Sequence, residues 1–288
     1  MTRTWQYPHA VEHGVPVELL ATLAEAIGEY LLIGSYARDV VSRGVLGMTL
    51  TMPRTRDLDV AVAVRDTAES YRRLVQPLEG SSVSRLQFRV PDLPEIPIDV
   101  IPYGDLPDLR EIPVGTGRDD ERTLDATGMA EAAACALSVD LAGKLVLRVP
   151  PLHALIALKL LAYGLRVELG ETKDARDLAL LFLGSQRSYE DCHANSYLAP
   201  SAMEHDPDRV GPWLVGVRIR RDFGSAITDR IDSATRHPLL PGLLRTQARG
   251  TWPSSTPSSL DWRTLLADLR SGLSDRDSAA ETTDPEPS

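Results

Sequence analysis

The chain has 288 residues, 43% of them hydrophobic and 25% charged, which is ordinary for a globular protein and enough to build a real core. Two cysteines are too few for a disulfide framework, and the sequence contains neither an apolar run near the ~20 residues of a membrane helix nor a signal-peptide core at its start. These features predict a cytoplasmic protein without a membrane partner. The net charge of −10 argues weakly against a surface coated for nucleic acid, but it is compatible with a local basic groove.

The first 150 residues alternate between two periodicities. Apolar residues at helical spacing, such as Leu19, Leu23 and Ile27, predict helices, whereas short apolar runs bounded by glycine or proline predict strands. We expect helices over residues 15–30, 36–45 and 67–78, and strands over 30–33, 57–64, 84–90 and 96–101, with two more strands within 130–149. A polar loop spans 44–56, and residues 105–128 have no regular pattern. This half is therefore expected to adopt an α/β (α+β) fold.

The second half has a helical pattern. Proline is well tolerated in a first helical turn, so Pro150-Pro151 is expected to close a strand and open a helix. Helices are expected over 152–165, 172–183, 207–226 and 225–235. Residues from 250 have a linker composition, 260–273 predict a short amphipathic helix, and 274–288, with five acids against one base, predict a disordered acidic tail. The expected domains are 1–150, 151–249, and this linker, helix and tail over 250–288.

Gly34-Ser35 stands between an expected strand and an expected helix. Glycine at such a turn lets backbone N–H groups approach a phosphate, and the following helix N-terminus favours its negative charge. Strand–glycine–helix turns are common, so this signal is weak when taken alone.

Three aspartates add a stronger signal. Asp57 and Asp59 lie two residues apart and so share one face of a strand, where two carboxylates repel unless a cation holds them. Asp99 puts a charge inside an apolar strand, where an unpaired carboxylate is expensive. If the two strands are neighbours, the three carboxylates meet near Gly34-Ser35 and suit Mg²⁺. The alternatives are a solvated strand end neutralised by arginine 54 or 56, and a buried salt bridge between Asp99 and Arg89.

The joint pattern resembles the polymerase-β-type nucleotidyltransferase superfamily and, more narrowly, the AbiEii/AbiGii-type bacterial nucleotidyltransferases. The similar motifs are Ile33-Gly-Ser-Tyr-Ala-Arg-Asp39, Thr55-Arg-Asp-Leu-Asp-Val-Ala-Val62, Ile98-Asp-Val-Ile-Pro-Tyr-Gly104, Leu158-Lys-Leu-Leu-Ala-Tyr163 and Lys173-Asp-Ala-Arg-Asp-Leu178, within residues 15 to 235. This resemblance implies a nucleotidyltransferase sheet flanked by helices, followed by a helical half. It implies an NTP co-substrate and Mg²⁺, with Mn²⁺ as the alternative ion.

The resemblance also assigns roles. Gly34, Ser35 and Arg38 would contact the triphosphate, Asp57 and Asp59 would hold both metals, and Asp99 would complete the metal that activates the acceptor. Lys159 would neutralise triphosphate charge, and either Asp174 or Asp177 would complete the site.

The residues themselves support one further expectation and leave one alternative open. The turn near Gly170 is expected to fold the next helix back toward Lys159 and bring an aspartate within its reach. The alternative for that contact is a structural ion pair that joins two helices.

Members of the subgroup include toxins of toxin–antitoxin or phage-defence systems, some of which modify the tRNA acceptor end. The resemblance thus implies tRNA and a cognate antitoxin as partners. The alternatives are an antibiotic-type enzyme with a small-molecule acceptor, and a relative that binds nucleotide or a partner protein without catalysis.

Overall fold

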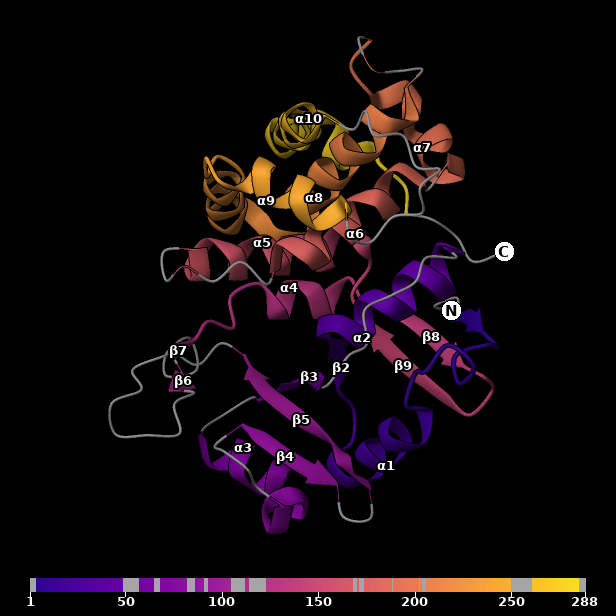
Figure 1. Ribbon diagram of the computed structural model, residues 1–288, viewed down its shortest axis with the longest axis vertical. Helices are drawn as coiled ribbons and strands as arrows, with labels where there is room; N and C mark the ends of the chain where they lie inside the picture. Colours follow the sequence, from indigo (N-terminus) through magenta and orange to yellow (C-terminus); the bar gives the residue numbers. More distant parts are fainter. Residues whose placement is uncertain are drawn as a thin grey trace. The chain divides into compact units, whose positions relative to one another are not determined.

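The computed structural model of the chain divides into two compact units, the first formed by Met1–Val40 and Pro53–Pro150 and the second by Val41–Met52 and Pro151–Ser288 (Figure 1). The division at Pro150 coincides with the change of sequence pattern, but residues 41–52 cluster with the helical unit. The structure describes residues 4–48, 57–64, 68–81, 86–90, 93–104, 112–113, 123–167, 170, 174–187, 189–201, 203, 206–249 and 261–284. Each unit is described by itself.

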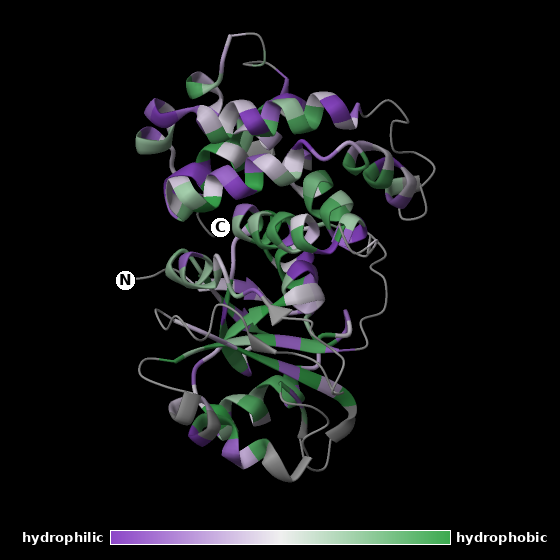
Figure 2. Cartoon of the chain, turned by 90° about the vertical axis from the view of Figure 1, so that its left-hand side faces the viewer, coloured by the Kyte–Doolittle hydropathy of each residue, from purple (hydrophilic) through white to green (hydrophobic). Residues whose placement is uncertain are grey.

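The first unit is built on a mixed seven-stranded sheet. Its strands, in spatial order, are β1 (Thr4–Tyr7), β8 (Leu137–Leu141), β9 (Leu145–Val149), β2 (Leu31–Ile33), β3 (Leu58–Ala63), β5 (Leu93–Tyr103) and β4 (Gln87–Val90). The pairs β1–β8, β9–β2 and β3–β5 are parallel, whereas β8–β9, β2–β3 and β5–β4 are antiparallel. A separate ribbon pairs β6 (Ile112–Pro113) with β7 (Thr123–Leu124). Figure 2 shows the strands largely in hydrophobic colours with isolated hydrophilic bands.

Among the described residues, four α-helices accompany this sheet. In Figure 1, α1 (Val17–Ile27) and α3 (Ala68–Val75) lie on one side of it, and α2 (Gly34–Asp39) and α4 (Met129–Ala134) lie on the other. Helix α2 runs directly into a π-helix at Val40–Val45. The sequence pattern predicts α1, α2 and α3 within a few residues, but it misses α4. The run Met-Ala-Glu-Ala-Ala-Ala consists of strong helix formers, and it precedes the two strands that were expected within 130–149.

The second unit is helical. Its helices are α5 (Leu152–Arg166), α6 (Asp174–Arg187), α7 (Tyr189–Asn195), α8 (Pro207–Thr235), α9 (Leu240–Arg249), α10 (Trp262–Ser274) and α11 (Arg276–Glu281), with a 3-10 turn at Ser196–Leu198. Gly224 inside α8 has a φ of 66°, a left-handed conformation that kinks the helix. This kink explains why the sequence pattern predicts two helices that meet near residue 225. No described helix combines the length and hydropathy that a membrane span requires.

Helices α8 and α10 pack closely against each other through their glycines. A Cβ on Gly216 of α8 would lie 2.2 Å from the carbonyl oxygen of Leu269, and a Cβ on Gly272 of α10 would lie 2.0 Å from that of Trp213. Paired glycines therefore let the two backbones touch. Beside this contact, Arg209 donates two hydrogen bonds to the carboxylate of Asp268, at 3.0 and 2.8 Å.

The expectation of a disordered tail over 274–288 is wrong for residues 274–284, while 285–288 lie outside the described residues. Ala279 of α11 is buried in an apolar cluster with Cys192 and Trp213. Beyond α11, the backbone N–H of Thr283 donates to Asn195 Oδ1 at 3.1 Å, and Asp284 accepts from Arg221 at 2.8 Å. Because polar side chains of α7 and α8 bind this polar segment, it does not need much apolar surface of its own. Helices α10 and α11 belong to the helical unit.

Candidate functional site

Asp57, Asp59 and Asp99 form a carboxylate cluster in the first unit. Asp59 and Asp99 are direct register partners on the parallel strands β3 and β5, and Asp57 lies in the bend before β3. One carboxylate oxygen from each residue lies within 4.8 Å of the other two. Asp57 is exposed, whereas Asp59 and Asp99 are half-buried. The expected meeting of the three carboxylates is thus observed in the structure.

The side chains of β3 alternate between a fully buried face and the face that carries Asp59. Leu58, Val60 and Val62 point to the opposite face and are fully buried, which anchors the strand. Ala61, the next residue on the face of Asp59, is also fully buried. Along this face Asp59 is half-buried, Ala61 is buried and Ala63, the last residue of β3, is exposed. The structure thus combines a strand anchored by buried side chains with a carboxylate cluster that is partly accessible to solvent.

Gly34 lies directly beside Asp59. Because Ile33 pairs with Asp59 in the β2–β3 register, the first residue of α2 meets the start of β3. Gly34 has a φ of 67°, and a Cβ there would lie 2.0 Å from Asp59 Oδ2. The backbone therefore approaches the carboxylate as closely as it does only because residue 34 has no side chain. The expected proximity of Gly34 to the aspartates is met.

Ser35 and Arg38 follow on α2 and differ in exposure. Ser35 is half-buried, whereas Arg38 is only 2% exposed. The Nε and Nη2 atoms of Arg38 both donate to Asp39 Oδ1, at 2.8 and 2.6 Å. The guanidinium is therefore held by its neighbour in the chain, and its expected contact with a triphosphate stays a prediction.

Two residues beside Asp99 were not anticipated from the sequence. Gln87 on β4 donates from Nε2 to Asp99 Oδ1 at 3.0 Å, and Tyr71 on α3 donates to the carbonyl oxygen of Val100 at 2.8 Å. Burial, together with the negative charge of Asp99, raises the pKa of Tyr71 above its ordinary value, so its hydroxyl stays protonated. No spacing rule identifies either residue, because both contacts depend on which elements flank β5.

The two alternatives to a metal site, in which an arginine neutralises the carboxylates, involve side chains that the structure does not describe. Residues 54 and 56, and the greater part of the loop expected over 44–56, are not described, and neither is the side chain of Arg89. Within the same loop, residues 44–48 belong to the end of the π-helix and the turn after it. Met48 packs there against Leu180 and Leu183 of α6.

Lys159 lies in the second unit between two aspartates. Its Nζ is 3.3 Å from Asp174 Oδ1 and 2.7 Å from Asp177 Oδ2, and Arg166 Nη1 is 2.8 Å from Asp174 Oδ2. Asp174 is only 2% exposed. The expected return of α6 toward Lys159 is confirmed. Both candidate aspartates contact the lysine, and Asp174 is also neutralised by Arg166, so the contact joins α5 to α6 as an ion-pair network.

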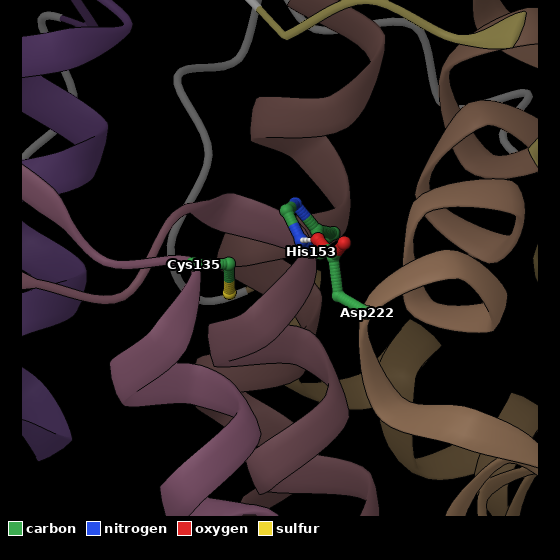
Figure 3. A group of neighbouring side chains, drawn as sticks. All are labelled: Cys135, His153 and Asp222. Atoms are coloured by element: carbon green, nitrogen blue, oxygen red, sulfur yellow. Dashed lines mark hydrogen bonds and ion pairs between the residues drawn. The ribbon is translucent and has the colours of Figure 1, made fainter. Parts of the chain in front are cut away.

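A buried histidine occupies the same unit. Figure 3 shows the side chains of His153, on α5, and Asp222, on α8, pointing at each other, with Nε2 2.7 Å from Oδ2. Cys135, drawn in the same view, belongs to the first unit. Burial lowers the pKa of His153, although the hydrogen bond to Asp222 opposes this shift. A carboxylate can only accept a hydrogen bond, so the neutral ring carries its proton on Nε2.

Asp222 also binds Arg221, and Arg221 contacts Asp284, the last described residue of the chain. Burial opposes ionisation of Asp222, but hydrogen bonds from His153 and Arg221 outweigh it and lower the pKa of the carboxyl group. Arg221 in turn holds Asp284, and the guanidinium of Arg218 donates both to Asp191 and to the carbonyl oxygen of Thr283. This network fastens the last described residues to α8.

No protein-family model matches this chain, and no curated protein matches it. The features that bear on function are therefore the carboxylate cluster of the first unit and the sequence motifs around it.

Proposed function

We propose that this chain is a metal-dependent nucleotidyltransferase, which transfers a nucleoside monophosphate from an NTP to an acceptor hydroxyl. The acceptor oxygen bonds to the α-phosphorus, the bond to the β-phosphate breaks, and pyrophosphate leaves with the electron pair while the hydroxyl proton passes to solvent. The observation that carries this proposal is the cluster of Asp57, Asp59 and Asp99, with oxygens within 4.8 Å of one another, beside the backbone of Gly34.

The donor set suits Mg²⁺, or Mn²⁺ as the alternative ion. Mg²⁺ binds oxygen ligands at about 2.1 Å, so two ligands of one ion lie up to about 4.2 Å apart, close to the spread of these carboxylates. It is commonly held by one or two carboxylates together with substrate phosphates, and the exposed Asp57 leaves the cluster open to such a partner. When bound, the metal neutralises charge on the phosphates and makes the acceptor hydroxyl easier to deprotonate.

The residues of the chain have separate roles in this proposal. Asp59 and Asp99, on adjacent strands, fix the spacing of the metal ligands, and Asp57 completes them from the bend. Gly34 keeps the backbone close to the ligands, and Ser35 offers a hydroxyl and an N–H to the triphosphate. The charge-neutralising role that the resemblance gives Lys159 stays a prediction, because the lysine is paired with Asp174 and Asp177 inside the helical unit.

The resemblance to AbiEii/AbiGii-type nucleotidyltransferases extends the proposal to the acceptor. It favours the tRNA acceptor end, and it makes a cognate antitoxin the expected protein partner. Both extensions depend on the sequence motifs, while the metal and nucleotide assignment depends on the geometry of the carboxylates.

The test is a labelling assay with each NTP labelled on its α-phosphate, Mg²⁺ and total tRNA. We expect one or more NTPs to label tRNA, and we expect EDTA or Asp59→Asn to abolish the label. The matched control is Asp140→Asn, because Asp140 is a carboxylate of the same sheet that accepts a hydrogen bond from the turn residue Gly143. Full labelling by Asp59→Asn, or none by the folded wild type with any NTP and any acceptor, would refute the assignment. Label on a small molecule instead of tRNA would refute only the acceptor.

A further inference from the structure

The inference concerns Gln87 and depends on the proposed function. The sheet registers place Ile33, Asp59, Asp99 and Gln87 in one row across β2, β3, β5 and β4. Directly paired residues on neighbouring strands point to the same face of a sheet. Asp99 therefore has Asp59 on one side and Gln87 on the other.

Gln87 contacts Asp99 directly. Its amide Nε2 donates to Asp99 Oδ1 at 3.0 Å, which is a good hydrogen-bond length. The terminal torsion of a carboxylate is soft, so a donor on one oxygen sets the plane of the group. Gln87 thereby determines in which direction the carboxylate of Asp99 offers its remaining lone pairs.

The backbone at Asp99 is fixed independently of this contact. Tyr71 donates to the carbonyl oxygen of Val100 at 2.8 Å, and the N–H of Val100 donates to the carbonyl oxygen of Leu86 at 2.8 Å. Helix α3 and the residue before Gln87 thus hold β5 from two directions. With the strand held, the hydrogen bond from Gln87 restricts the side-chain torsion of Asp99.

The chemical character of the donor matters as well. An amide satisfies one lone pair of the carboxylate without adding a positive charge, whereas an arginine or lysine would add one. A neutral donor therefore orients Asp99 while leaving its negative charge for a cation. Donors of this kind, placed behind a ligand, commonly tune the affinity of metal sites.

From this placement we infer that Gln87 is a positioning residue for the metal site, acting through Asp99 and raising the affinity for a divalent cation. The test compares the wild type with Gln87→Met, which keeps the length of the side chain but removes its amide group. Mn²⁺ binding is measured by calorimetry without NTP, and NTP transfer is measured over a range of Mn²⁺ concentrations.

We expect Gln87→Met to bind Mn²⁺ about 10–100-fold more weakly, as is typical when such a donor is lost. Saturating Mn²⁺ should restore its kcat to within a few-fold of the wild type, whereas Asp99→Asn should not be restored. The matched control is Gln6→Met, because Gln6 is an exposed glutamine on β1, the opposite edge strand. Gln87→Asn is a second variant, whose shorter side chain cannot make the same contact with Asp99. It should also weaken Mn²⁺ binding. This variant replaces Gln87→Met as the test if Gln87→Met folds poorly.

The failures of the two proposals can be told apart. Wild-type Mn²⁺ affinity in both folded Gln87 variants, together with lost binding in Asp99→Asn, would overturn the role of Gln87 and leave the metal site intact. Absence of Mn²⁺ binding in the wild type would overturn the metal site and this inference with it. A kcat of Gln87→Met that stays low at saturating Mn²⁺ would also overturn the positioning role.

Discussion

The backbone of Gly34 and the carboxylate of Asp59 are so close that a methyl group on Gly34 would lie 2.0 Å from Oδ2 and 2.7 Å from Cγ. No ordinary side chain can share that space, so a substitution must displace the carboxylate, the start of α2, or both.

Gly34→Ala should therefore lose metal binding as well as stability. The φ of 67° is strained for alanine, at a cost of about 1–3 kcal/mol. Gly143→Ala provides the comparison, because Gly143 has a φ of 69° with nothing near its Cβ position. Urea denaturation should show a lower free energy of unfolding in both variants, whereas Mn²⁺ calorimetry should show weaker binding only in Gly34→Ala. Equal Mn²⁺ affinities would show that the contact with Asp59 is irrelevant to the site.

Asp59→Ala should abolish transfer while leaving the fold intact. We expect a loss of ~10³-fold in rate, comparable to the removal of a major electrostatic contributor. Without metal, the melting temperature should be unchanged or higher, because one of three clustered negative charges has gone. Labelled-NTP assays and thermal melts in EDTA measure the two effects. A variant that is active and correctly folded would contradict the metal mechanism.

Lys159→Met should destabilise the helical unit, because Asp174 and Asp177 are both buried beside the lysine. We expect a loss of about 2–3 kcal/mol, less than for a fully buried pair because Lys159 is partly exposed. Adding Asp177→Asn should recover part of the loss by removing an uncompensated charge. Lys144→Met is the control: its partner Glu18 is exposed, and denaturant melts should detect no change. Equal stability of both lysine variants would rule out a structural contribution from this network.

Acid should destabilise the protein partly through His153. Burial lowers its pKa in the folded state below the ordinary value of 6.5, so the unfolded chain binds the proton first as the pH falls. The stability that the neutral ring contributes is fully present above pH 6.5. It is lost as the pH falls from there through the lower pKa of the folded state. His153→Gln, whose amide can still donate to Asp222, should therefore lose less stability between about pH 7.5 and about pH 5.5. Identical pH dependence of the two proteins in urea titrations would contradict the burial of a neutral histidine.

Removal of residues after Ser274 should destabilise the helical unit, because it removes Ala279 from its apolar cluster and Asp284 from Arg221. We expect a melting temperature lower by about 5 °C or more, since ~1 kcal/mol corresponds to ~2–4 °C in a protein of this size. Truncation after Asp284 keeps every contact described above and serves as the comparison. If the chain that ends at Ser274 has the same melting temperature as the full chain, the contacts of α11 with α8 add nothing to stability.

The sequence predicts local structure well where the periodicity is strong. Helices α1, α5 and α10 and strands β2 and β3 lie close to their expected limits, and the proximity of Asp59 to Asp99 follows once β3 and β5 are neighbours. The order of the strands is not written in any local pattern. Gln87 could therefore not be identified, because its importance depends on the pairing of β4 with β5.

Composition misleads where polar groups find polar partners. The last residues look disordered because they contain few apolar side chains, yet Asn195, Arg218 and Arg221 bind them. Arg38 likewise looks available to a ligand in the sequence, whereas its guanidinium is buried against Asp39. Such interactions between residues far apart, or between immediate neighbours, leave no periodic signal.

The glycine contact between α8 and α10 has a consequence for the order in which the chain can fold during its synthesis. Helix α8 leaves the ribosome before α10 exists, and Trp213 and Gly216 then lack the surface that later covers them. Since domains generally fold as units while synthesis proceeds from the N-terminus, the sheet residues up to Pro150 are all available long before this helix pair can close. The nascent helical unit must therefore keep an apolar stripe exposed until residue 274 has emerged. During that interval the uncovered apolar surface favours aggregation.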